Sequence, residues 1–122
     1  MGAERRRHPR YEILAQVKLA RGDTTYVLDV ENISESGACV RWHEPKAPSW
    51  LENGRRLTMD LSGADVPGTL TLAGQIVHVG MGPPVQFGVL FDATLPEGSR
   101  ERLDELIRLA ADPSRPPPLR RK

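Results

Sequence analysis

The chain has 122 residues, one cysteine and a formal net charge of +1 at pH 7, from 17 Lys and Arg against 16 Asp and Glu. This length suits one domain with a modest core and is too short for a second independently folding unit. A single cysteine excludes an internal disulfide framework, and no apolar run approaches the roughly 20 residues of a membrane span. We therefore expect a soluble cytoplasmic protein without a membrane partner.

The positive charge is concentrated at the two ends. Residues 1–10 hold four Arg against one Glu, and residues 113–122 hold four basic residues and no acid. Residues 11–112 are left with nine basic and fifteen acidic side chains, a net charge of −6. A body of that charge repels a long polyanion, so DNA is disfavoured as the main partner, whereas a small anion held by the N-terminal arm is compatible with it.

The first segment alternates apolar and polar residues with a period of two, which predicts a strand with one buried face; its apolar positions are Tyr11, Ile13, Ala15, Val17 and Leu19. Gly22 lies in a predicted turn, and a second alternating segment from Tyr26 to Val30 predicts the hairpin partner. That strand runs into the sequence 32–37, Asn-Ile-Ser-Glu-Ser-Gly, after which Ala38, Val40 and Trp42 continue the alternation.

Gly and Pro turns, among them Asn53-Gly54, separate the remaining strands, which are predicted around 57–61, 70–79 and 85–91. Six or seven short strands joined in this way predict a small closed antiparallel barrel. Ser99 is expected to cap an amphipathic helix whose apolar face is Leu103, Leu106, Ile107 and Ala110. The expected fold class is all-β with one C-terminal helix that packs on the barrel.

Three segments follow along the chain. We expect residues 1–10 to form a flexible basic arm and residues 11–112 to form the barrel with its closing helix. Residues 113–122 are expected to be a disordered tail, because Asp112-Pro113 stops the helix and the Pro-rich run after it cannot form a core.

The arm carries a candidate anion clamp. Arg6 and Arg10 are spaced R-x-x-x-R, so one short segment presents two planar, permanently charged forks. Such forks suit bidentate acceptors on phosphates or on a guanine edge, and a guanidinium plane also stacks on a base.

The turn 32–37 carries the complementary candidates. Asn32 can donate and accept hydrogen bonds at a base edge, and the Ser34 hydroxyl is short enough to reach a phosphate or base. Gly37 is expected to tolerate positive φ and to let a ligand approach the backbone. Because the turn joins two strands it is rigid, and together with the arm it indicates a site for a small, phosphate-bearing, guanine-like ligand.

The order of these features resembles the PilZ domain, the small barrel with which bacteria sense cyclic di-GMP. The resemblance lies in Arg6 and Arg10 as R-x-x-x-R and in Asn32, Ser34 and Gly37 as [D/N]-x-S-x-x-G, and it extends to the closing helix. It implies a PilZ-type barrel that needs no cofactor and binds cyclic di-GMP as its ligand through these five residues.

Arg5 directly precedes the R-x-x-x-R and is expected to add a phosphate contact, which would favour two stacked ligand molecules over one. The resemblance also implies that binding orders the arm and that a separate effector protein receives the signal, in control of motility, exopolysaccharide or biofilm. The effector's identity and the formation of a homodimer stay open.

Two other functions stay open at this point: a PilZ-like protein-interaction adaptor without nucleotide, and a nucleic-acid binder acting through the basic ends. No enzyme is expected, because no nucleophile, base or oxyanion donor accompanies the Asp residues. No metal site is expected, because the three His do not cluster with acids at metal-ligand spacing. Cys39 is expected to be a small buried strand residue, and Trp42 and Trp50 are expected to serve packing.

Overall fold

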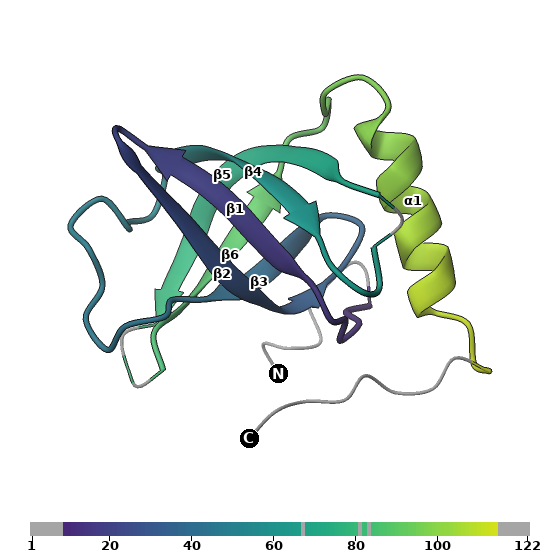
Figure 1. The fold of residues 1–122 in the computed structure, drawn as a ribbon, viewed down its shortest axis with the longest axis horizontal. Helices are drawn as coiled ribbons and strands as arrows, with labels where there is room; N and C mark the ends of the chain where they lie inside the picture. The colour runs from purple at the N-terminus through teal and green to yellow at the C-terminus, as the bar shows by residue number, and fades with distance from the viewer. Residues whose placement is uncertain (1–8, 67, 81, 83, 115–122) are drawn as a thin grey trace.

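In the computed structural model, which describes residues 9–66, 68–80, 82 and 84–114, six antiparallel strands close into one barrel and a helix lies against one end of it (Figure 1). In chain order the elements are β1 (Gln16–Arg21), β2 (Thr24–Ile33), β3 (Gly37–Arg41), β4 (Arg56–Ser62), β5 (Leu70–Gly80), β6 (Gln86–Phe91) and α1 (Ser99–Ala110). Around the barrel the order is β1-β2-β3-β6-β5-β4. The predicted all-β class with one C-terminal helix is confirmed.

The alternating apolar residues fill the interior of the barrel. In β4 every second residue is buried, and β6 follows the same alternation. The apolar face predicted for the helix, from Leu103 to Ala110, is buried as well. Each large side chain removed from water in this way contributes roughly 1.5–3 kcal/mol, so this core is what makes the barrel a stable support for a surface site.

The first strand begins later than the alternation predicts. Ile13 and Ala15 are buried as expected, but β1 starts only at Gln16. The Leu14 N–H donates to the Asp65 Oδ2 carboxylate at 2.7 Å, and this segment bonds to β2 at two separate places, at Tyr11 with Ile33 and at Ala15, whose carbonyl accepts the Val30 N–H at 3.1 Å. Buried and exposed residues therefore alternate here without a continuous strand, because the Asp65 carboxylate accepts the Leu14 N–H that would otherwise be available for strand pairing.

A β-bulge at Glu31 divides β2 into two parts. Val30 pairs with Val40, whereas Asn32 pairs with Cys39, so Glu31 is the additional residue. The extra residue shifts the inward–outward alternation by one position, as bulges do. Ile33 is therefore buried and Asn32 is left on the outer face.

Two predicted turn features are confirmed and one helix feature is wrong. The loop between β1 and β2 has Gly22 at φ 60°, and Gly54 at φ 88° lies in the turn before β4. The N-cap of α1 is Gly98 at φ 83°, with no side-chain cap, and Ser99 is the first helical residue and buried. The predicted Ser99 cap therefore does not form.

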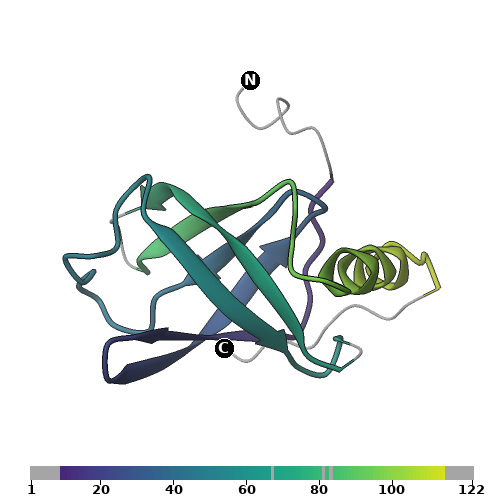
Figure 2. The ribbon, with the colours of Figure 1, turned by 90° about the horizontal axis from the view of Figure 1, so that it is seen from above.

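The seam between β1 and β4 closes the barrel with fewer residue pairs than its neighbours. Only Gln16, Val17 and Lys18 pair with β4, whereas β1 and β2 pair from Gln16 to Arg21. Beyond Lys18 the two strands diverge, and Figure 2 shows the β1–β2 hairpin spread away from the start of β4.

No helix in the described part of the chain is long and apolar enough to cross a membrane.

Candidate functional site

The chain enters the barrel directly beside the 32–37 turn. The Tyr11 N–H donates to the Ile33 carbonyl at 2.8 Å, and the Ile33 N–H donates to the Tyr11 carbonyl at 2.9 Å, which makes an isolated antiparallel bridge. Arg10, one residue earlier, donates from Nη1 to Asn32 Oδ1 at 3.1 Å across 22 residues of sequence. The structure thus brings one residue of each predicted half of the site into contact.

Arg5 and Arg6 lie outside the described residues, as do the rest of the arm up to His8 and the tail from Arg115. The flexible arm, the disordered tail and the ligand contacts of both arginines therefore stay predictions. The described contacts of Arg10 and Tyr11 fix where the arm leaves the barrel, which is next to Asn32.

Ser34 serves the turn itself in this structure. It is 3% exposed, and its hydroxyl accepts the N–H groups of Ser36 and Gly37 at 3.2 Å each and contacts the Gly37 carbonyl at 3.3 Å. The Ser34 N–H donates to the same carbonyl at 2.8 Å. These contacts close the turn in the manner of a Ser/Thr turn, so direct contact of Ser34 with a ligand stays a prediction.

Gly37 is required for a different reason from the one the sequence suggested. Its φ is not positive. A Cβ at this position would lie 2.4 Å from the carbonyl oxygen of Val89 on β6. The absent side chain allows β3 to pair closely with β6 where the turn meets the barrel, which holds the turn in place.

An outward row of residues continues from Asn32 across four strands. Asn32 on β2 pairs with Cys39 on β3, Cys39 pairs with Gly88 on β6, and Gly88 pairs with His78 on β5. Cys39 is partly exposed, which corrects the expectation that it is buried. Gly88 carries no side chain, and the row begins at Asn32, which contacts Arg10. Alternation within single strands could not reveal it, because it depends on the register between strands that are distant in sequence.

The comparison with protein families matches the PilZ domain to residues 4–109. The chain belongs to the PilZ domain family. The comparison with curated protein sequences found no match.

Solved PilZ structures share the fold. The PilZ domain with c-di-GMP of YcgR from Escherichia coli is 15% identical with a TM-score of 0.67, and the match covers 86% of this chain and 91% of that one. The K. pneumonia MrkH–c-di-GMP complex is 18% identical with a TM-score of 0.70, and the Bacillus subtilis inhibitor of motility MotI/DgrA is 14% identical with a TM-score of 0.63. Each of these two matches covers 85% of this chain and spans about half, 50%, of the other protein.

Two acidic side chains, Glu31 and Glu35, lie in or next to the 32–37 turn. Glu31, next to Asn32, forms an ion pair with Arg41 on the neighbouring strand. Glu35 lies inside the turn sequence and is exposed. A cavity of ≈ 670 Å³ is lined by Glu31 and Arg41 and extends to Ile13, in the segment that precedes β1. The Arg41 guanidinium thus balances the negative charge of Glu31 beside Asn32.

The tryptophans pack together at the opposite end of β3 from Gly37. The ring centroids of Trp42 and Trp50 are 5.6 Å apart in an edge-on arrangement, and Tyr26 lies 5.0 Å from Trp42. The Arg21 guanidinium lies 4.9 Å from the centre of the Trp50 ring. These contacts confirm the packing predicted for both tryptophans.

Among the described residues, no group of three or more His, Cys, Asp and Glu side chains is arranged to hold a metal ion.

Proposed function

We propose that this PilZ protein is a receptor for cyclic di-GMP, which binds on the outer face between the N-terminal arm and the 32–37 turn. The observation that carries the proposal is the Arg10–Asn32 hydrogen bond beside the Tyr11–Ile33 bridge, which joins the R-x-x-x-R and N-x-S-x-x-G motifs at one place. The similar PilZ structures of YcgR and MrkH are described as complexes with c-di-GMP, which supports the identity of the ligand.

The arginines supply the charge that the ligand needs. Arg6 and Arg10 take the guanine O6 and N7 acceptors or the phosphates, and Arg5 adds a phosphate contact in a complex with two ligand molecules. Asn32 holds a base edge or a phosphate from the outer face, with Ser34 and Gly37 beside it in the turn. A ligand replaces the Arg10–Asn32 bond with charge-assisted bonds to its own phosphates.

Binding orders the arm over the ligand, and the rearranged surface is read by a separate effector protein in the control of motility, exopolysaccharide or biofilm. Ordering costs on the order of 1–2 kcal/mol per backbone residue, so only a ligand with several charged acceptors can drive it. A cyclic dinucleotide with two phosphates and two guanines meets that requirement. The protein performs no chemistry on the ligand.

Calorimetric titration with cyclic di-GMP tests this function directly. The wild-type protein is expected to bind, and Arg10→Ala and Arg6→Ala are each expected to weaken binding at least about tenfold, because each removes a charge-assisted fork. Arg108→Ala, which removes an arginine from the last turn of α1, is the matched control and should bind like the wild type. Equal affinity in all four proteins would reject the proposed site.

The adaptor function is the second candidate, and one observation favours it. Arg10 and Asn32 bond to one another, and the Ser34 hydroxyl is used within its own turn, so part of the hydrogen-bonding capacity of the site is taken up by the protein itself. An adaptor would show neither heat of binding nor a rise in melting temperature with cyclic di-GMP, and the Arg6→Ala and Arg10→Ala proteins would still recover the same partner protein as the wild type.

A further inference from the structure

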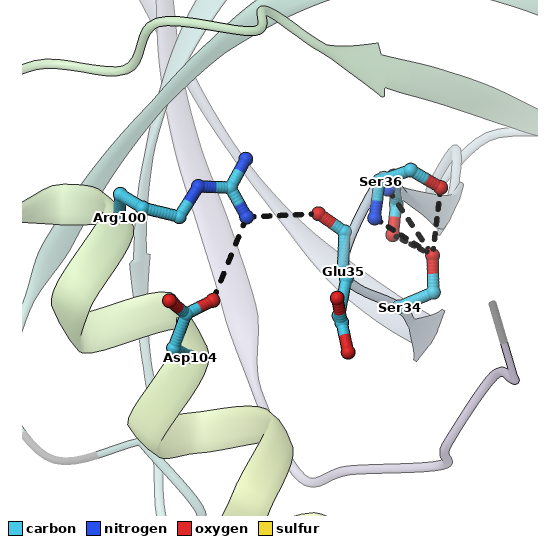
Figure 3. Close-up of polar contacts among 6 residues, drawn as sticks. Ser34, Glu35, Ser36, Arg100 and Asp104 are labelled. Carbon is cyan, nitrogen blue, oxygen red and sulfur yellow. Dashed lines mark hydrogen bonds and ion pairs between the residues drawn. The ribbon is translucent and has the colours of Figure 1, made fainter.

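One side chain of helix α1 reaches the 32–37 turn. Arg100 Nη1 donates to the Glu35 carbonyl oxygen at 3.1 Å, across 65 residues of sequence. The same nitrogen lies 3.6 Å from Asp104 Oδ1, one helical turn further on. Figure 3 shows the guanidinium between the helix and the turn, with Asp104 on its helix side and Glu35 on its turn side. Asp104 therefore holds the guanidinium in the direction of the turn.

The turn is a junction for three parts of the protein. The Ile33 carbonyl accepts the Tyr11 N–H at the root of the arm, and the Ser36 carbonyl accepts the Phe91 N–H at the end of β6 at 2.8 Å. The Glu35 carbonyl, which lies between these two in sequence, accepts Arg100 from the helix. Because the Ser34 hydroxyl closes the turn internally, a displacement at one of these carbonyls is transmitted to the others.

Two side-chain hydrogen bonds connect the first turn of the helix to loops of the barrel. Its N-cap, Gly98, supplies no side-chain hydrogen bond to the first turn. Two arginines of that first turn donate to carbonyl oxygens of separate loops, Arg100 to Glu35 and Arg102 to Thr69, the latter at 2.7 Å. The two bonds are chemically alike, but only the Arg100 bond leads to the 32–37 turn.

We propose that Arg100 is a positioning residue that couples the 32–37 turn to the first turn of helix α1, so that the arm, the ligand and the helix start respond together. The part of this inference that concerns the ligand rests on the proposed function, whereas the coupling in the free protein does not. Coupling of two sites is reciprocal in free energy, so a ligand that is favoured by the held turn also orders the helix start by the same factor.

Amide hydrogen exchange in the free protein tests the coupling alone. In Arg100→Ala, the amides of Ser36 and Gly37 are expected to exchange about fivefold faster, the effect of losing one hydrogen bond of ordinary strength. Arg102→Ala is the matched control, because it removes an arginine–carbonyl bond from the same helical turn and should leave those two amides unchanged. Arg100→Lys should restore part of the protection. Equal exchange of the two amides in Arg100→Ala and Arg102→Ala overturns the inference.

Titration with cyclic di-GMP tests the second part. Arg100→Ala is expected to lower the affinity roughly three- to tenfold and to abolish the added protection of amides 99–103 on binding, whereas Arg102→Ala keeps wild-type affinity. Wild-type binding with equal affinity in both variants overturns the inference and leaves the proposed function intact. If the wild type does not bind, the proposed function fails, and the exchange measurement in the free protein still decides whether Arg100 holds the turn.

Discussion

Replacement of Gly37 by Ala tests the reason for the last residue of the N-x-S-x-x-G motif. The added Cβ would lie 2.4 Å from the Val89 carbonyl oxygen and 3.4 Å from its carbon, whereas ordinary contacts begin at 3.4 Å. The obstacle is backbone, so a side chain cannot rotate away. The β3–β6 ladder itself must shift where Gly37 pairs with Leu90.

The expected cost follows from these distances. Forcing an extra carbon into a closely packed place costs about 1–3 kcal/mol, and the lower chain entropy of Ala in the unfolded state returns part of that. For a domain of this size we expect the melting temperature to fall by roughly 5–10 °C. Since φ at Gly37 is not positive, none of this loss comes from backbone strain.

Gly88→Ala is the matched control. Gly88 lies on β6 in the same ladder, and a Cβ there would meet only Val77 and His78 side-chain atoms at 3.7 and 3.8 Å. Its melting temperature, followed by circular dichroism, should stay within about 2 °C of the wild type. If Gly37→Ala melts like Gly88→Ala, close strand pairing is not the reason for glycine at position 37.

Three further outcomes are expected. Asn32→Asp keeps a hydrogen-bond acceptor at a position where the [D/N]-x-S-x-x-G motif admits either residue and should retain cyclic di-GMP binding, whereas Asn32→Leu should weaken it at least about tenfold; equal calorimetric affinities would exclude a side-chain contact. Ser34→Ala leaves two turn N–H groups without their acceptor and should lower the free energy of unfolding in urea by about 1–3 kcal/mol; an unchanged transition would contradict the role of the hydroxyl. Trp50→Ala should cost about 1–3 kcal/mol of stability without change in affinity, and weakened binding would place Trp50 in the site.

Local patterns were sufficient for the class and order of the elements. Period-two alternation identified the buried residues of β1, β4 and β6, and the helix period identified its buried face. These predictions succeed because strand and helix geometry fix which side chains share a face, whatever their partners are. The two motifs also predicted that Arg10 and Asn32 serve one site, although not that they bond directly to each other.

Some features of the fold and of the site depend on contacts between residues far apart in sequence, and local sequence patterns could not predict them. Strand β5 needs glycine at position 74, because a Cβ there would lie 2.1 Å from the Leu90 carbonyl oxygen of β6, and no local pattern shows this requirement. The bulge at Glu31 changes the face of every residue after it, and no local signal marks it. The role of Arg100 depends on a carbonyl 65 residues away, which spacing cannot predict.

The short β1–β4 seam is the place where unfolding of this barrel is expected to begin. Ala20 and Thr58 would face one another if the pairing continued, but the register ends at Lys18 and Asp60. Thermal fluctuations are expected to separate β1 from β4 first, because this ladder has the fewest residue pairs. The β2–β3 pairing, which carries the turn, is expected to remain intact at that stage. The face of β2 and β3 that we propose as the binding site is therefore expected to remain folded through the first stage of unfolding.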